Sequence, residues 1–322
     1  MMPPAQRPLA IIGNVNVDII VGDCPPTLQP GTESMVAHGD VRPAGCVGNT
    51  AQAWMAMEVP FQVAANTGND MFGDWLRAIF RAHSGAWPRE SCPTTFSVGI
   101  AHPDSERTFL TTHGHIARLG LDEVKRSLDL EALKGGIALV VGGFLTDSLT
   151  SEYAGLFDLL EGHDIDVALD TGWPITGWTR AIRAQCRSWL ARCGHLLMNE
   201  VELLSLFEAP GIEEAMDAAA EAMPKGGHVI AKRGPLGASG LSASRRVHVP
   251  APAVTAVDTI GAGDVFNAGY LAALANGEPF RDAIAAGVAA ASLAISTHPR
   301  EYGAPLAAQR QTGSGQQAPC RP

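Results

Sequence analysis

The chain has 322 residues, enough for one large α/β domain or for a large domain with a small appendage. A hydrophobic share of 46%, only 17% charged residues and 35 glycines exclude a disordered or fibrous chain and indicate a compact protein with many tight connections. The net charge of −10 leaves no basic field, so neither nucleic acid nor an anionic membrane is an expected partner.

The cysteines and the N-terminal residues indicate the cellular compartment. No C-x-x-C pair and no nearby histidine pair stands at zinc-ligand spacing, so we expect reduced, mostly buried thiols. The N-terminus through Pro8 lacks the apolar core of a signal peptide, and the longest apolar runs are too interrupted to span a membrane. The sequence therefore favours a cytoplasmic protein. Its cysteines are Cys24, Cys46, Cys92, Cys186, Cys193 and Cys320.

The first third of the chain combines one buried strand with smaller pieces. The continuously apolar run Leu9–Ile12 predicts a central parallel strand that ends at Gly13. Residues 14–45 mix short β-prone stretches with proline and glycine, which favours small strands outside the main sheet. The expected elements that follow are a helix over 45–58, a strand over 61–65, a helix ending at residue 82, and a β-hairpin over 94–100 and 107–112.

From about Leu121 onward, apolar strands alternate with helical segments. This alternation predicts a parallel sheet covered by helices on both faces, with the active site at the carboxyl ends of the strands. We expect strands at 137–141, 165–169, 196–198, 229–231, 238–241 and 247–249, and helices over 151–161, from 200, over 212–223, over 264–276 and from 279. The tail from Ala307 is rich in Gln, Gly, Ser and Pro, which is typical of disorder.

A glycine-rich stretch, residues 258–264, precedes the apolar helix that begins near Asp264. Its small residues leave backbone N–H groups uncovered at a helix N-terminus, which is a favourable place for an anion. A carboxylate beside an anion is repelled by it, and proton abstraction from an attacking hydroxyl is a chemical reason for placing Asp264 there. The alternative is that Asp264 only caps the helix and the glycines only form a turn.

The residues of this stretch carry a family resemblance. Asp258-Thr259-Ile260-Gly261-Ala262-Gly263-Asp264 resembles the C-terminal signature of the ribokinase-like (phosphofructokinase B type) carbohydrate kinases, and residues 13–18, 45–73, 199–202 and 232–237 match the family in the same order. The resemblance covers residues 9–306. It implies a doubly wound, mainly parallel sheet flanked by helices, with a small β-sheet lid. The implied core is 9–14, 46–94 and 116–306, the implied lid is 15–45 and 95–115, and 307–322 is a disordered tail.

The resemblance also implies a reaction, the transfer of the ATP γ-phosphoryl group to a hydroxymethyl group of a small sugar. Asp264 corresponds to the catalytic base, which orients and deprotonates the attacking hydroxyl. Gly261, Ala262 and Gly263 correspond to the anion hole, where N–H donors stabilise the charge on the transferring group.

Other motif positions imply nucleotide and metal contacts. Asn199 and Glu202 resemble the family's N-x-x-E pair near the phosphates, with Glu202 acting on Mg²⁺, directly or through water; a first-turn surface glutamate is the alternative. Positions that correspond to nucleotide contacts are Lys232, Gly234 and Gly237, for which a plain strand-ending turn is the alternative. Positions that resemble a monovalent cation (K⁺) site are Asp258 and the Ile260 carbonyl.

For the sugar, Asn16 and Asp18 resemble the family's N-x-D substrate residues, and Gly45 and Asn49 its glycine-rich substrate turn. Carboxylate and amide groups can hold adjacent hydroxyls, although turns and caps would also use such residues. The sequence departs from the family at Cys46 and Val47, where small residues are usual, and at Glu58, where Gly or Ser is expected. These departures leave the sugar undefined. His113, His115 and the Asp170–Trp178 segment could line the pocket, although a solvated lid or a packed loop explains them as well. Arg107 could approach the ligand from the lid, although a surface charge on the hairpin is the more ordinary expectation.

Three further classes of protein are alternatives to the sugar kinase. A nucleoside kinase of the same family would need an aromatic lid to stack a base, and this lid has few aromatic residues. A non-catalytic sugar-binding regulator would not need Asp264 and the complete anion loop. A nicotinamide dehydrogenase would need the G-x-G-x-x-G turn, which is missing. An exposed lid edge could also pair with a second lid to form a homodimer.

Overall fold

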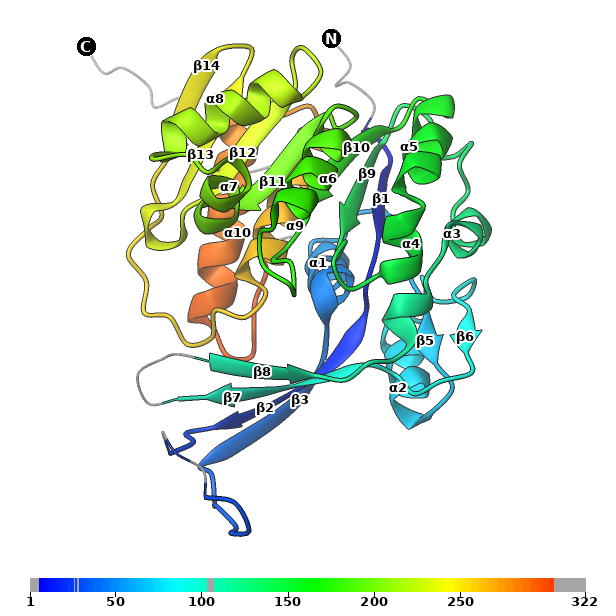
Figure 1. The fold of residues 1–322 in the computed structure, drawn as a ribbon, viewed down its shortest axis with the longest axis vertical. Coiled ribbons are helices and arrows are strands. Elements are labelled where there is room, and N and C mark those ends of the chain that lie inside the picture. The colour runs from blue at the N-terminus through cyan, green and yellow to red at the C-terminus, as the bar shows by residue number, and fades with distance from the viewer. Residues whose placement is uncertain (1–5, 26, 28, 103–106, 304–322) are drawn as a thin grey trace, which may run out of the picture.

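The computed structural model describes residues 6–25, 27, 29–102 and 107–303. Figure 1 shows a large sheet with helices on both faces, and a smaller sheet crossing beneath it. The predicted disordered tail, 307–322, lies outside the described residues. Across the described ranges, no helix is sufficiently long and apolar to span a membrane.

The large sheet has eight strands in the order β14-β13-β12-β11-β10-β9-β1-β4. The strands from β4 to β12 are parallel, whereas β13 and β14 continue the sheet as antiparallel neighbours. The continuous apolar runs of the inner strands suit a sheet that is buried on both faces. Their bounds are β1 Leu9–Ile12, β4 Gln62–Ala64, β9 Ile137–Val141, β10 Asp166–Asp170, β11 His195–Asn199, β12 His228–Lys232, β13 Ala238–Ser242 and β14 Arg245–Val249.

Two helix layers cover this sheet, each over its own hydrophobic core. Successive strand residues point to opposite faces, so Ile11 and Leu139 join one core while Ile12 and Val140 join the other. The first layer contains α1 Gly45–Ala56, α2 Met71–Ile79, α9 Ala262–Ala275 and α10 Phe280–Ser296. The second contains α3 Leu121–Ser127, α4 Asp147–Ser151, α5 Tyr153–Gly162, α6 Arg180–Leu190, α7 Glu200–Phe207 and α8 Ile212–Ala222.

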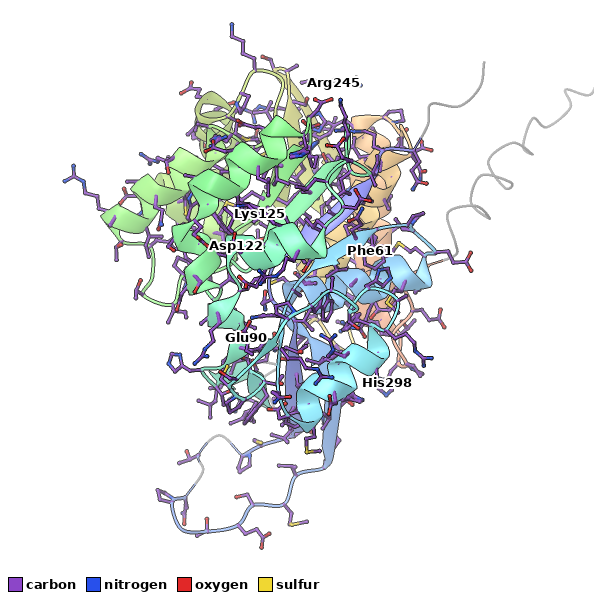
Figure 2. All side chains as sticks on the ribbon, turned by 90° about the vertical axis from the view of Figure 1, so that its right-hand side faces the viewer. Phe61, Glu90, Asp122, Lys125, Arg245 and His298 are labelled. Atoms are coloured by element: carbon purple, nitrogen blue, oxygen red, sulfur yellow. The ribbon has the colours of Figure 1, made fainter. Side chains whose placement is uncertain are left out.

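The smaller sheet, which we call the lid, has the order β3-β2-β7-β8, with β2 and β7 parallel and the outer pairs antiparallel. Its strands are β2 Asn16–Gly22, β3 His38–Ala44, β7 Phe96–Ala101 and β8 Arg107–Thr111. Asp18 stands in register with Arg42 and Ser97, so these three share one face. The described residues between β2 and β3 extend away from the body (Figure 2). In the same view, Asp122 and Lys125 on α3 lie on the surface of the body.

The predicted fold class is confirmed, and several boundaries differ. The helix expected over 45–58 ends at Ala56, because Glu58 adopts a left-handed φ of 56° that a helix cannot continue through. The helix expected to reach residue 82 ends at Ile79, and the one expected from Ser151 is two helices, α4 and α5. Elements that the sequence analysis missed are α3, α6, the short pair β5 Thr67–Gly68 and β6 Arg89–Glu90, and the 3₁₀ turns His115–Arg118 and Gly234–Leu236.

His115 is a packed residue at the base of the lid. Its Nδ1 accepts a hydrogen bond of 2.9 Å from the Thr95 N–H, and its Nε2 lies 2.9 Å from the Val15 carbonyl, to which it donates. Burial lowers the pKa of His115 to about 4, so the ring is neutral. Of the two alternatives left open for this residue, packing is the one that the structure supports.

Candidate active site

The candidate site lies where several elements end together. β10, β11 and β12 end at Asp170, Asn199 and Lys232, at the same edge of the parallel sheet. Asp264 lies in the first turn of α9, and this turn reaches the same edge because its Gly263 lies next to Lys232. Carboxyl ends of parallel strands are the usual ligand-binding edge of such sheets.

Asp264 is oriented by the α1 helix. The Asn49 Nδ2 donates a hydrogen bond of 2.8 Å to Asp264 Oδ2, and the Thr50 hydroxyl donates to the Asp264 carbonyl at 3.2 Å. The preceding Gly261 has a φ of 72°, and a Cβ there would lie 2.6 Å from Asn49 Nδ2. Glycine is therefore required at 261 for both the left-handed turn and the close approach of Asn49.

The charge environment of Asp264 suits a proton acceptor. Burial is the largest influence and raises the pKa of Asp264 to about 7; the nearby Asp170 raises it too, while the Asn49 hydrogen bond and Lys232 oppose the shift. A carboxylate with a pKa near neutrality is a stronger base than an ordinary aspartate. The Cys46 thiol also lies against this carboxylate, and burial followed by the charge of Asp264 keeps the pKa of Cys46 well above its usual value.

The glycine-rich loop closes into the first turn of α9. The Ala262 N–H donates to the Thr259 carbonyl at 3.2 Å and is therefore engaged within the turn. The N–H groups of Gly263 and Asp264 belong to the first helical turn, where helix geometry supplies no carbonyl partner. A Cβ on Gly263 would lie 3.3 Å from Lys232 Nζ, so the ammonium group is next to this loop. The loop thus combines N–H donors with a fixed cation.

Lys232 is held by two residues that the sequence analysis did not assign. Its Nζ donates to Asp170 Oδ2 at 2.6 Å and to Asn267 Oδ1 at 3.2 Å, and Asn267 Nδ2 donates to the same Asp170 oxygen at 2.7 Å. Burial works to lower the pKa of Lys232, but Asp170 and Glu202 raise it above its usual value. The ammonium therefore stays charged. Asp170 had one sequence signal, its place directly after an apolar strand.

Asn199 and Glu202 form a capping box at the start of α7. Asn199 Oδ1 accepts from the Glu202 N–H at 2.9 Å, and Glu202 Oε2 accepts from the Asn199 N–H at 3.0 Å. Unlike a surface glutamate, Glu202 is only 6% exposed, and burial followed by the Asp170 charge raises its pKa to about 7. Within the described residues, no group of three His, Cys, Asp or Glu side chains could hold a metal. Mg²⁺ here would need phosphate or water oxygens in addition to Glu202.

The two predicted nucleotide glycines lie in the turn after β12. Gly234 begins the 3₁₀ turn Gly234–Leu236, and Gly237 follows it. A Cβ on Gly234 would meet nothing within 4 Å, whereas one on Gly237 would lie 2.0 Å from the Val249 carbonyl. Gly234 therefore borders open space, and the packing of β13 against the chain after β14 accounts for Gly237.

On the lid side, Asp18 is buried among amides. Asn16 Nδ2 donates to Asp18 Oδ1 at 3.0 Å, and Asn14 Nδ2 donates to Asn16 Oδ1 at 3.2 Å. Gly45, with a φ of 84°, packs so closely that a Cβ would lie 2.5 Å from Asn16 Oδ1. Burial, the largest influence, raises the pKa of Asp18 to about 6, and Arg42 opposes it. The structure brings Asn16, Asp18 and Gly45 together, with Asn16 directed at Asp18.

Asp258 carries two cationic partners. Arg42 of β3 donates from Nη1 to Asp258 Oδ2, and Arg300 donates from Nη2 to the same oxygen at 2.9 Å. The Ile260 N–H donates to the other carboxylate oxygen, Oδ1, at 3.0 Å. Both oxygens of the carboxylate predicted for a monovalent cation are therefore engaged by protein donors.

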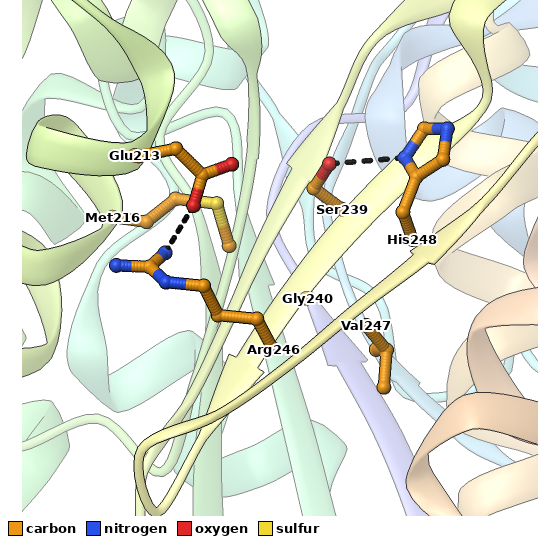
Figure 3. Close-up of a pocket in the computed structure, with 7 residues that line it drawn as sticks. All are labelled: Glu213, Met216, Ser239, Gly240, Arg246, Val247 and His248. Carbon is orange, nitrogen blue, oxygen red and sulfur yellow. Dashed lines mark hydrogen bonds and ion pairs between the residues drawn. The ribbon is translucent and has the colours of Figure 1, made fainter.

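Two surface cavities lie elsewhere. One, of about 240 Å³, lies between α8 and the β13–β14 hairpin, where Arg246 pairs with Glu213 at 2.6 Å and Ser239 contacts His248 Nδ1 at 3.2 Å (Figure 3). The other, of about 460 Å³, borders His195 and His228, at the amino ends of β11 and β12. Neither is lined by any residue predicted for the site.

Comparison with known proteins decides the family. Residues 7–305 match the model of the pfkB family carbohydrate kinases. The chain belongs to this family. It is 29% identical over 269 residues to the deoxyribokinase of Salmonella typhi, which covers 80% of this chain and 82% of that protein.

Solved structures show the same fold. The adenosine kinase of Sinorhizobium meliloti superposes with a TM-score of 0.79 at 20% identity, covering 96% of this chain and 100% of the other. A putative ribokinase II from E. coli, solved in complex with ATP and Mg²⁺, has a TM-score of 0.75 at 21% identity and covers 90% and 93%. These results confirm the predicted family and its class, an ATP-binding carbohydrate kinase of ribokinase-like fold.

Proposed function

We propose that this carbohydrate kinase transfers the ATP γ-phosphoryl group to a hydroxymethyl group of a small sugar, with Asp264 as the base. The observation that carries the proposal is the partly buried Asp264 carboxylate, which lies in the first turn of α9 and is oriented by Asn49 at 2.8 Å. A pKa of about 7 lets this carboxylate take a proton from a hydroxyl at neutral pH.

The chemical step is an in-line displacement at phosphorus. The sugar hydroxyl oxygen forms a bond to the γ-phosphorus as the bond from that phosphorus to the β,γ-bridging oxygen breaks. The hydroxyl proton passes to Asp264, from which solvent later removes it, and the bridging electron pair leaves with ADP. The products are the sugar phosphate and ADP, and the proton is released to solvent.

The charge that spreads over the transferring group is stabilised at the start of α9. The N–H groups of Gly263 and Asp264, in the first turn of α9, donate to it, aided by the helix dipole, while the Ala262 N–H keeps the turn closed. Lys232 adds a cation that Asp170 and Asn267 hold next to this loop. Asn199 and Gly234 contact the nucleotide in this proposal, and Gly237 holds the turn that carries Gly234.

Mg²⁺ fits the site only as part of a nucleotide complex. Glu202 is the side chain that would hold it, directly or through water, because Glu202 is buried beside Asp170 and has one carboxylate oxygen, Oε1, outside the capping box. When bound, the ion neutralises charge on the β- and γ-phosphates. Glu202 itself orders the α7 N-terminus through its bond to the Asn199 N–H.

The sugar is held between the lid and α1. Asp18 accepts hydrogen bonds from sugar hydroxyls, and Asn16 fixes its orientation from the side. A small sugar of the ribose or deoxyribose type agrees with the Salmonella typhi deoxyribokinase relative. Lid closure over the sugar would exclude water, the competing phosphoryl acceptor.

The experiment is a coupled ADP-release screen with Mg-ATP over pentoses, deoxypentoses, ketohexoses, keto-deoxy sugar acids and nucleosides. We expect turnover with at least one free sugar. Silence across this panel, together with thermal stabilisation by one sugar, would instead support a non-catalytic sugar-binding protein.

A nucleoside is the second candidate acceptor, and one lid feature favours it. A Cβ built on Gly99 would lie 2.6 Å from Ile20 Cδ1 and 2.9 Å from Phe109 Cε1, so both side chains cover Gly99 on the face that carries Asp18. Phe109 is 44% exposed, and a base could stack on it. Turnover with nucleosides and none with free sugars would select this candidate.

We also propose a homodimer through the outer lid face. Ile19, Val41, Val98 and Leu110 stand in register on the face opposite Asp18, and Val41 and Leu110 are 50% and 60% exposed. An exposed apolar sheet face favours a partner of the same chemistry, and a second copy supplies one. Sedimentation analysis should give a dimer, and Leu110→Lys should give a monomer.

A further inference from the structure

The loop that leads into the anion hole is held by an unusual charge arrangement at Asp258. Its Oδ2 accepts from Arg42 of the lid and from Arg300, which follows α10, the latter at 2.9 Å. Arg300 Nη2 also lies 3.3 Å from the Asp258 carbonyl oxygen. One carboxylate is therefore flanked by two guanidinium groups that arrive from different parts of the chain.

These residues do not fit a monovalent cation. The Asp258 side chain is 23% exposed, and those of Arg42 and Arg300 are 22% and 15% exposed, so the charges interact in a partly desolvated environment. A K⁺ ion at this carboxylate would compete with two fixed cations for its oxygens and would be repelled by both. The positive charge that such an ion would bring is already present.

The same contact joins the lid to the loop. Asp258 Oδ1 fixes the turn by accepting from the Ile260 N–H at 3.0 Å, directly before Gly261. Arg42 stands on β3 as the cross-strand neighbour of Asp18, which binds the sugar in the proposed function. A movement of β3 away from the core would break the Arg42–Asp258 pair. It would thereby remove one of the groups that hold the loop.

We propose that Arg42 is a positioning residue: together with Arg300 it takes the place of a monovalent cation at Asp258, and it thereby couples lid closure to the geometry of the 258–263 loop. The consequence for the proposed kinase is that nucleotide binding needs the lid contact and needs no K⁺. This consequence for nucleotide binding rests on the proposed function. The structural coupling between Arg42 and the 258–263 loop does not depend on turnover. The Arg42 charge also opposes the rise in the pKa of Asp18, so Arg42 acts on the carboxylates of both the lid and the loop.

The first test needs neither substrate nor activity. The melting temperature of the wild-type protein is measured in potassium chloride and in tetramethylammonium chloride at equal ionic strength. Separately, amide hydrogen exchange at residues 259–263 is compared between Arg42→Gln and Arg246→Gln. Arg246 on β14 is the matched control, because it also pairs with two carboxylates, those of Glu213 and Asp217 on α8, and neither belongs to the loop. We expect equal wild-type melting temperatures, and exchange at 259–263 that is about tenfold faster in Arg42→Gln only.

The second test measures the affinity for the magnesium complex of a non-hydrolysable ATP analogue by calorimetry. Arg42→Gln should lose about tenfold in affinity, a typical size for coupled sites, and added methylguanidinium should restore part of it. Chemical rescue distinguishes a missing guanidinium from a general loss of structure. Arg246→Gln should bind the analogue like the wild type.

A higher wild-type melting temperature in potassium, or unchanged exchange at 259–263 in Arg42→Gln, would overturn the proposal. Failure of the proposed function shows differently, as an absence of ADP release with every sugar and nucleoside. That failure leaves both the melting and the exchange readouts in place, so the two results are separable.

Discussion

The Asn49 amide donates a hydrogen bond of 2.8 Å to the Asp264 carboxylate and thereby joins the start of α1 to the first turn of α9. The two residues are 215 positions apart in the chain. The motif around Asn49 predicts a sugar contact, whereas in the structure Asn49 Nδ2 is directed at the proposed base. Asn49 is thus placed to orient the Asp264 carboxylate, and its hydrogen bond occupies one lone pair of Asp264 Oδ2.

Replacing Asn49 separates these roles. Asn49→Ala should lower kcat by about 100-fold, because a poorly oriented base loses much of the contribution of proton transfer. A residue that only binds sugar would instead raise KM with little change in kcat. The control is Gln52→Ala on the same helix, since the Gln52 amide donates to the Pro43 and Gly48 carbonyls rather than to Asp264. Steady-state kinetics on both variants distinguish the outcomes.

The rate should depend on pH through two raised carboxyl pKa values. Burial raises the pKa of Asp264 to about 7 and that of Asp18 to about 6. Both residues act in their ionised forms, so protonation removes the base and weakens the sugar contact. We therefore expect kcat/KM to rise with pH through this range and to level off above it. A profile that is flat between about 6 and about 7 would argue against these assignments.

The Lys232–Asp170 pair makes a prediction about stability. Both side chains are 12% exposed, so removing one partner leaves a buried charge without compensation. Lys232→Met should lower the free energy of unfolding by about 3–5 kcal/mol. The double variant Lys232→Met/Asp170→Asn should recover most of that loss, because the introduced amide carries no charge and its oxygen could still accept from Asn267. Equal destabilisation of the single and double variants in urea titrations would contradict the buried-charge explanation.

Glu58 offers a stabilising substitution. Two residues after the end of α1, it holds a left-handed φ of 56°, a conformation that glycine adopts without the cost imposed by a Cβ. Glu58→Gly should raise the free energy of unfolding by about 1 kcal/mol. Glu221→Gly, inside the last turn of α8, should lower it instead. Thermal unfolding of the two variants gives opposite shifts if backbone conformation is the cause.

Much of the fold could be predicted because its signals are local. The inner strands, such as Ile137–Val141, are continuous apolar runs, and the glycine-rich loop before Asp264 is a contiguous motif. The α6 helix was missed because arginine, glutamine and serine interrupt its apolar residues and only a narrow stripe is buried. Its first residues also follow a loop rich in tryptophan, glycine and proline.

The site was only partly predictable, for a different physical reason. Lys232 and Asp170 are 62 residues apart, Asn267 and Asp170 are 97 apart, and only the sheet brings them together. Similarly, the role of Arg42 depends on a lid strand crossing beneath the core. Individual site residues could be predicted from their sequence motifs. The distant partners that determine their ionisation states could not.

The most direct test of the central claim is turnover by Asp264→Asn. The carboxylate is predicted to be the base, so ADP release with the first accepted sugar should fall by about 10²–10⁴-fold or more, while calorimetry gives nearly unchanged affinity for the magnesium complex of a non-hydrolysable ATP analogue. Asp217→Asn, which alters a surface partner of Arg246, should keep full turnover. Wild-type turnover in Asp264→Asn would contradict the account.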